Sequence, residues 1–171
     1  AASIADEEPE PSDAGAVLET VLRNLRTSVP PGGMITHDPL PVIRMGAVHL
    51  RQLFQNLIGN AIKYRGPAPL RVHVSAHRAG DFWRFSVEDN GIGIAAEYRQ
   101  QIFGIFKRLH TQQQYPGTGI GLAICQRIAE RYGGKIWVES ELDKGSSFIF
   151  TVPVERAIQA FTGERPTLYV A

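Results

Sequence analysis

A run of alternate glycines is the first feature of this chain that suggests chemistry. Gly117, Gly119 and Gly121 stand two residues apart, directly before a segment with the pattern of an amphipathic helix. Glycine has no side chain, so a ligand can lie against its main chain. The start of a helix presents unpaired N–H groups and the positive end of its dipole, which suits a phosphate. The run lacks the lysine of a Walker loop and the acidic residue of a dinucleotide-binding turn. We therefore expect a phosphate-binding loop of another kind, and the alternative is a simple tight turn.

A second candidate is the carboxylate of Asp89, in the segment DNGIG at 89–93. The alternating residues of 82–88 predict a strand, and Asp89 has the same parity as Phe85 and Val87, so it is expected on the apolar face. An acceptor there can bind the exocyclic amine of adenine, whereas it would oppose the carbonyl oxygen of guanine. These residues predict an adenine pocket, and the alternative is an ordinary turn between strands.

A third candidate is a polar stripe on the helix predicted over 48–64. At about 100° per residue, Asn56, Asn60 and Lys63 gather opposite an apolar face, together with His49. A merely solvated face would more usually carry Glu, Lys and Arg, because Asn is a poor helix former. Asparagine oxygens are uncharged ligands suited to Mg²⁺, and a lysine can contact a phosphate. For His49, a solvated helix residue is the simpler interpretation.

Together these segments resemble the ATP-binding catalytic domain of sensor histidine kinases, in the superfamily that also contains gyrase, Hsp90 and MutL. The family's motifs have counterparts in the expected order at 56–64 (N box), 89–93 (G1 box), 102–106 (F box), 117–122 (G2 box) and 144–148 (last glycine box). The resemblance covers about residues 14–154. It agrees with the α+β fold that the hairpins and helices predict: a two-layer α/β sandwich with a mixed, mostly antiparallel sheet and helices on one face.

The resemblance implies roles for individual residues in binding ATP and Mg²⁺. Asn56, Asn60 and Lys63 would form the catalytic phosphate end, with the two asparagines as metal ligands. Asp89 would bind the adenine amine, helped by water and by Ser147. The resemblance also places Tyr64 beside the nucleoside and has Gly91 and Gly93 make room for the base. The other ATP-binding residues that it implies are Ile94, Phe106 in the F box, Lys107 and Arg108 directly after it, and, at the hinge end of the lid, Gly117, Thr118, Gly119, Ile120, Gly121 and Leu122.

The residue type at position 56 separates a kinase from a motor ATPase. The ATP-hydrolysing relatives place a glutamate there as a base for water, whereas this chain has Asn56. An amide cannot take a proton from water at neutral pH, so rapid hydrolysis is disfavoured while transfer to a better nucleophile remains open. The resemblance thus implies transfer of the γ-phosphoryl group to a histidine on a separate dimerisation domain, with a response regulator as the indirect partner.

The chain is not expected to phosphorylate itself. Its histidines lack the family's phosphoacceptor context, and His37-Asp38 is followed by Pro39 and Pro41, which a helix would not accommodate. Two alternatives remain: a nucleotide-binding regulatory (pseudokinase) module acting through partner contacts, and an anti-sigma-type serine kinase. Within the sensor kinases, segments 106–110 and 115–119 resemble phytochrome-like members.

Composition bounds the remaining classes. With 171 residues, 43% hydrophobic and a net charge of +1, the chain can form one ordinary domain with tails. The near-neutral net charge does not indicate a basic surface for nucleic acid, and no apolar run is long enough to span a membrane. We therefore expect a cytoplasmic domain without membrane contact, monomeric as an isolated fragment. Cys125 cannot form an internal disulfide and fits a packed core thiol.

Prolines, glycines and changes in composition predict how the chain is organised. Residues 1–11 are expected to be a disordered acidic linker, 12–154 the catalytic domain with an ATP lid at about 95–118, and 155–171 a C-terminal tail. The elements expected in the domain are a helix capped by Ser12 or Asp13 and reaching Arg26, extended segments around 34–36 and 42–44, the helix over 48–64, a hairpin of 70–79 with 82–88, a helix stopped by Gly133-Gly134, and a hairpin of 135–140 with 147–154.

Overall fold

The computed structural model describes residues 9–99, 101–103 and 121–154. Its elements, in chain order, are β1 (Pro11–Asp13), α1 (Ala14–Leu25), η1 (Arg26–Ser28), β2 (Met34–His37), β3 (Val42–Arg44), α2 (Ala47–Lys63), β4 (Arg71–Ala79), β5 (Phe82–Asp89), η2 (Ala96–Tyr98), η3 (Gln101–Phe103), α3 (Gly121–Arg131), β6 (Ile136–Glu141) and β7 (Gly145–Pro153).

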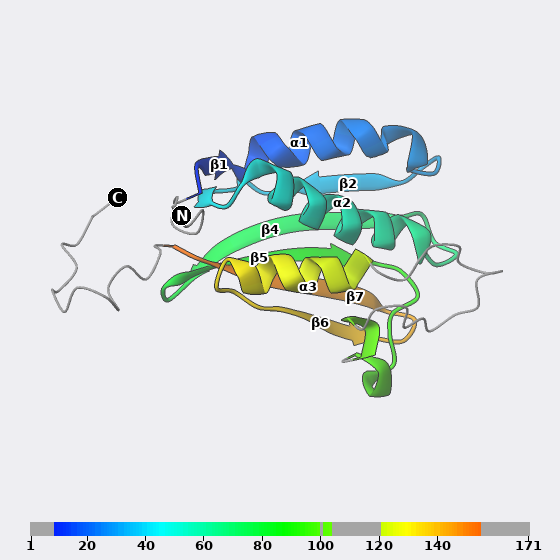
Figure 1. Ribbon diagram of the computed structural model, residues 1–171. Helices are drawn as coiled ribbons and strands as arrows, with labels where there is room; N and C mark the ends of the chain where they lie inside the picture. Colours follow the sequence, from blue (N-terminus) through cyan, green and yellow to red (C-terminus); the bar gives the residue numbers. More distant parts are fainter. Residues whose placement is uncertain (1–8, 100, 104–120, 155–171) are drawn as a thin grey trace, which may run out of the picture.

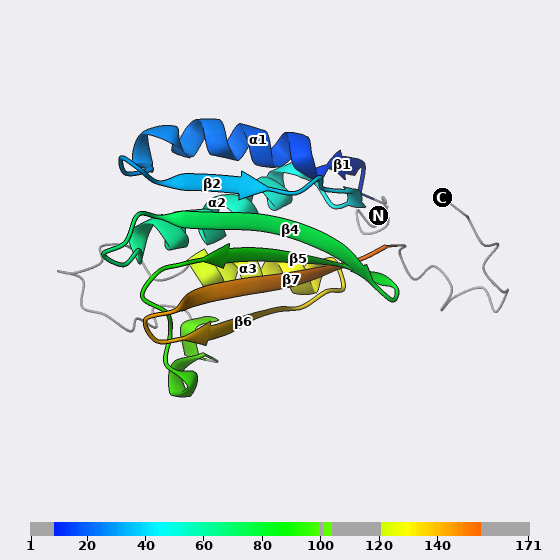
Figure 2. The same ribbon diagram turned by 180° about the vertical axis from the view of Figure 1, so that it is seen from behind.

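Two layers make up the domain. The main sheet has five strands in the order β2-β4-β5-β7-β6, in which β2 and β4 are parallel and the other neighbours are antiparallel. The helices α1, α2 and α3 lie on one face of this sheet (Figure 1), and from behind the strands are in front (Figure 2). The predicted fold class is therefore confirmed.

The core lies between the sheet and the helices. The register brings Phe85 of β5 opposite Phe150 of β7, and their rings stack with centroids 4.8 Å apart. Phe54 of α2 meets both rings edge-on, at 6.2 and 6.1 Å. All three side chains are fully buried, so the apolar face of α2 is fixed on the centre of the sheet. That contact directs the opposite side of α2 away from the sheet.

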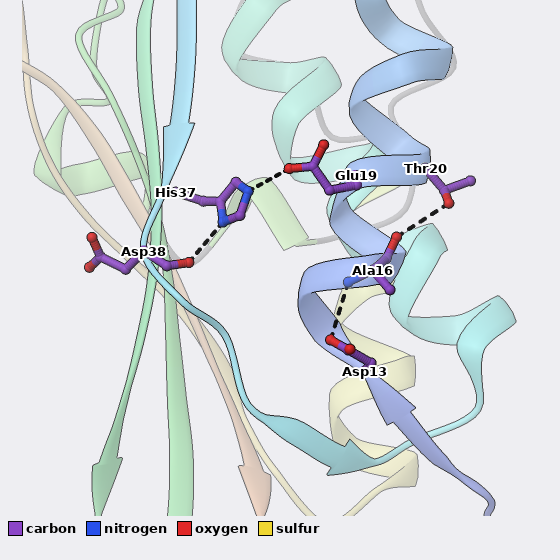
Figure 3. A network of polar contacts seen from close by, with 6 residues as sticks. All are labelled: Asp13, Ala16, Glu19, Thr20, His37 and Asp38. Atoms are coloured by element: carbon purple, nitrogen blue, oxygen red, sulfur yellow. Dashed lines mark hydrogen bonds and ion pairs between the residues drawn. The ribbon is translucent and has the colours of Figure 1, made fainter.

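Asp13 joins β1 to α1 and caps the helix. Its carboxylate accepts a hydrogen bond from the Ala16 N–H at 3.2 Å (Figure 3), which confirms one of the two predicted caps. Ser12 has another role, because its hydroxyl is buried and donates to the Met45 carbonyl at 2.6 Å. Pro11, which the sequence placed in the linker, pairs with Arg44 in a short ribbon of β1 and β3.

Glycines end the regular elements where the sequence predicted turns. Gly80 has φ of 62° between β4 and β5, and Gly133 has φ of 84° after α3. Residues with side chains are strained in this left-handed region, whereas glycine is not. Within the described ranges, none of the helices is long and apolar enough to cross a membrane.

Candidate nucleotide-binding site

The polar stripe of α2 stays partly open because the helix packs through its other side. Leu50, Leu53 and Leu57 are fully buried, whereas Asn56, Asn60 and Lys63 are half-buried. The Lys63 ammonium lies 5.7 Å from the centre of the Tyr64 ring, at the C-terminal end of the helix. The predicted stripe is therefore present as one surface, although its contacts with a nucleotide stay a prediction.

Asn56 meets the start of α3. A Cβ added to Gly121 would lie 3.3 Å from Asn56 Oδ1, so this glycine stands directly against the asparagine amide. Burial raises the pKa of the Cys125 thiol to about 12, and a hydrogen bond from Asn56 acts in the opposite direction. Asn56 Oδ1, the atom that would ligate a metal, thus lies at the first residue of α3.

Asp89 lies half-buried at the end of β5 with one oxygen engaged. Its Oδ1 accepts hydrogen bonds from the N–H groups of Gly91 at 2.8 Å and Ser146 at 3.3 Å. Burial raises the pKa of Asp89, these two hydrogen bonds oppose the rise, and the nearby Glu88 charge adds to it. In the part of the chain that the structure describes, Oδ2 has no hydrogen-bond partner. One acceptor atom is thus held in place and another remains available for a ligand.

Ser146, and not Ser147, stands beside Asp89. The register pairs Asp89 with Ser146, whereas Ser147 is opposite Glu88 and on the other face of the sheet. The role predicted for Ser147 beside Asp89 is therefore wrong. The alternation with Phe148 and Phe150, which face the core, was the signal in the sequence that could have identified Ser146.

A network of hydroxyls fixes the proton of Ser146. Ser140 Oγ accepts from the Ile94 N–H at 2.7 Å and donates to the Gly145 carbonyl at 2.9 Å. Ser140 has only one hydroxyl proton, so the 2.7 Å contact between the two serines must use the proton of Ser146. Ser146 Oγ consequently offers lone pairs, like Asp89 Oδ2. Sequence reasoning missed both serines.

The two glycines of the segment 89–93 have a structural role. A Cβ on Gly93, whose φ is 73°, would collide with the Glu141 carbonyl, and a Cβ on Gly91 would lie 2.6 Å from the Tyr64 carbonyl. Both carbonyls belong to the protein, so the glycines let Tyr64 and Glu141 approach the segment that follows Asp89. That they also make room for the adenine base stays a prediction.

The remaining predicted residues divide into described and undescribed ones. Phe103 is buried and meets Phe148 edge-on at 6.3 Å, so the start of the F box is anchored on β7. Ile94 donates its N–H to Ser140, and Leu122 packs partly buried against the core. Lying outside the described residues are Phe106, Lys107, Arg108, Gly117, Thr118, Gly119 and Ile120.

Comparison with known proteins defines the class. Residues 45–156 match the model of the family described as histidine kinase-, DNA gyrase B-, and HSP90-like ATPase. The chain belongs to this family of ATPases, and within it to the catalytic domains of sensor histidine kinases.

Individual relatives agree with this class. Cyanobacterial phytochrome A of Nostoc sp. is 53% identical over 138 residues, which are 80% of this chain and 18% of the relative. The adaptive-response sensory kinase SasA of Synechococcus elongatus is 41% identical over 125 residues, 72% of this chain and 32% of the relative. The chain thus spans about a fifth to a third of these curated relatives.

Solved structures show the same fold. The catalytic domain of histidine kinase ThkA superposes with a TM-score of 0.71 at 26% identity, over 86% of this chain and 97% of that one. Full-length ShkA, solved in complex with AMPPNP, gives a TM-score of 0.74 at 33% identity, over 90% of this chain and 33% of that one.

Proposed function

We propose that this chain binds Mg-ATP and transfers its γ-phosphoryl group to a histidine on a separate dimerisation domain. The observation that carries the proposal is that two kinds of group lie at the same end of the domain, where β5 ends and α3 begins (Figure 1). Asp89 and Ser146 offer acceptors at the ends of β5 and β7, and Asn56 offers its amide oxygen at the start of α3. ShkA, a similar histidine kinase, was solved with AMPPNP, a nucleotide bearing a triphosphate-like chain.

The adenine end would use acceptors that guanine does not match. Asp89 Oδ2 and Ser146 Oγ can take hydrogen bonds from an exocyclic amine, directly or through water. In guanine a carbonyl oxygen occupies the position of that amine, so acceptors would face each other. We infer that the pocket selects adenine nucleotides.

The phosphate end would use Asn56, Asn60 and Lys63 together with the start of α3. Among the described residues, no group of three or more His, Cys, Asp and Glu side chains is placed to hold a metal ion. The donor set fits Mg²⁺ that the phosphates largely neutralise, because neutral amide oxygens need not supply charge. When bound, Mg²⁺ would offset the negative charge on the transferring phosphoryl group. Lys63 and the N–H groups at the start of α3 would hold the phosphates.

Transfer is favoured over hydrolysis by the residue type at position 56, which is asparagine. An amide has no basic site that could activate a water molecule. The described part of the site therefore orients ATP without supplying a base for water. This supports a kinase whose phosphoryl acceptor is a nucleophile supplied by another domain.

His37 and His73 have other partners. His37 contacts Glu19 and the Asp38 carbonyl (Figure 3), and His73 contacts Thr36 and the Asp38 carboxylate. These contacts lie along β2, at the edge of the sheet beyond β4, whereas Asp89 ends the central strand β5. The acceptor histidine is accordingly assigned to another domain, from which a response regulator would receive the phosphoryl group. We also propose a cytoplasmic setting, because that compartment supplies ATP and response regulators.

Mixing the domain with the parent kinase's dimerisation domain and radiolabelled Mg-ATP tests the proposal. We expect acid-labile, base-stable phosphohistidine on the partner, and strong loss with Asn60→Ala. Asn24→Ala, on the exposed side of α1, is the matched control and should leave the signal unchanged. ATP binding without phosphohistidine on the authentic partner would favour the regulatory module instead, and phosphoserine would favour the anti-sigma-type kinase.

A further inference from the structure

The start of α2 is capped by a residue that directly follows another helix. Its N-cap is Gly46, which has no side chain to accept from the first N–H groups. Instead the hydroxyl of Tyr132, directly after the last residue of α3, accepts the Gly46 N–H at 3.2 Å. The cap of the helix that carries Asn56 and Asn60 is thus a tertiary contact.

His49 completes a relay of hydrogen bonds at this point. Its Nδ1 lies 2.5 Å from the Tyr132 hydroxyl oxygen, and the two rings meet edge-on with centroids 5.4 Å apart. The hydroxyl oxygen accepts from Gly46 and also shares one hydrogen bond with Nδ1, whose direction is set by the tautomer of the ring. Burial, and then the Arg131 charge, lower the pKa of His49, which agrees with a neutral ring. The relay runs from Gly46 through Tyr132 to His49 with each group satisfied.

The same two helices meet again at the nucleotide site. They run in opposite directions on one face of the sheet (Figure 1), and Asn56 contacts Cys125 and Gly121. His49 and Asn56 are seven residues apart on α2, and Tyr132, directly after α3, is seven residues from Cys125. Two polar contacts therefore join the helices in one antiparallel register, about two turns apart.

Between these contacts both helices carry buried apolar side chains. Leu53 and Ile128 are both buried in the core, and such side chains give little directional restraint. Hydrogen bonds are directional and fix the axial position. The end of α3 distant from the nucleotide thus sets where its first residue, Gly121, stands relative to Asn56.

We propose that Tyr132 and His49 are positioning residues that hold the phosphate-binding start of α3 against the Mg²⁺ ligands of α2. This inference rests on the proposed function, since it assigns ATP phosphates to that junction. The phosphate and adenine ends of the site should respond differently, because Asp89 lies on β5 and its position does not depend on the α2–α3 register. Loss of the relay should weaken ATP binding and leave adenosine binding unchanged.

Tyr132→Phe removes only the hydroxyl and is the first variant to measure. We expect Mg-ATP to bind about threefold to tenfold more weakly by calorimetry, with adenosine affinity unchanged by NMR titration. His49→Leu should reproduce the loss without adding to it in the double variant, because both remove one relay. His49→Gln should restore much of the affinity, since its amide oxygen can accept from Tyr132.

Thr151→Val is the matched control. Like Tyr132, Thr151 accepts a main-chain N–H through its hydroxyl, from Lys135 at 2.9 Å, but it lies on β7 away from α2. The control should lower thermal stability comparably while preserving the ratio of adenosine to ATP affinity. The inference is overturned if Tyr132→Phe leaves this ratio unchanged, or if Thr151→Val shifts it equally. Absence of any ATP binding by the wild-type domain would instead refute the proposed function.

Discussion

Replacing Asp89 by asparagine should separate ATP binding from folding. Asparagine keeps Oδ1, which can still accept from Gly91 and Ser146, so the end of β5 retains its hydrogen bonds. The other oxygen becomes an NH₂ group that faces the adenine amine. A hydrogen bond to a charged acceptor is lost and two donors are left opposed, at a combined cost of about 3 kcal/mol. We therefore expect Mg-ATP affinity to fall about a hundredfold.

The thermal stability of the Asp89→Asn domain, unlike its ATP affinity, should not fall. Burial, the largest cause, raises the pKa of Asp89 above its ordinary value of 3.8, so the folded state binds the proton more tightly than the unfolded state. This contribution to stability is fully present below pH 3.8 and is lost as the pH rises through the higher folded-state pKa. At neutral pH the ionised carboxylate is therefore a cost that asparagine removes. Asp89→Asn should melt at the wild-type temperature or above it.

Calorimetric titration with Mg-ATP and a thermal melt at pH 7 measure the two quantities on the same sample. Asp81→Asn makes the same charge change in the exposed turn between β4 and β5, so it controls for net charge. It should bind ATP like the wild type. An Asp89→Asn domain that binds ATP normally would refute the adenine assignment, and a wild-type domain that binds GTP as tightly as ATP would refute the selectivity argument.

Three further outcomes follow from described contacts. Cys125 should resist iodoacetamide in the folded domain and react in urea, since it is fully buried and its pKa is raised to about 12; rapid native labelling would contradict this. The pKa of His37 is raised first by its hydrogen bond to the Asp38 carbonyl and then by Glu19. Thermal melts should therefore show a stabilising contribution from His37 that is fully present below pH 6.5 and is lost as the pH rises through the raised folded-state pKa. Glu19→Gln should reduce that dependence, and an unchanged profile would dismiss the pair. Gly93→Ala should cost about 3 kcal/mol or more, because its Cβ meets the Glu141 carbonyl, whereas Gly80→Ala should cost about 1–2 kcal/mol of left-handed strain alone; equal denaturation midpoints would count against this reading.

Local sequence patterns were sufficient to predict the helices and strands. Apolar residues at helical spacing predicted α2, and alternation predicted β5 with Asp89 on its core side, because helices and strands repeat over a few neighbouring residues. Glycines predicted the ends at 80 and 133 for an equally local reason, the left-handed φ. The resemblance to a known family joined the separate phosphate, adenine and Mg²⁺ predictions into one ATP site.

Contacts between distant segments needed the fold. Ser147 was placed beside Asp89 by analogy, but strand pairing decides which of two adjacent serines faces the core, and it selects Ser146. Gly93 meets the Glu141 main chain, which is 48 residues away in the sequence. No local signal carries such information, because it arises only when β6 and the segment after β5 are brought together.

The sequence by itself determined which groups are available: acceptors at the end of β5, amides on α2, and a glycine at the start of α3. Tertiary structure alone decided how they are held. It brings the start of α3 against the Asn56 amide oxygen, and it caps α2 with the hydroxyl of Tyr132, which directly follows α3. The reason is physical: residue type sets what a side chain can donate or accept, whereas the partner is chosen by packing of segments far apart in the chain.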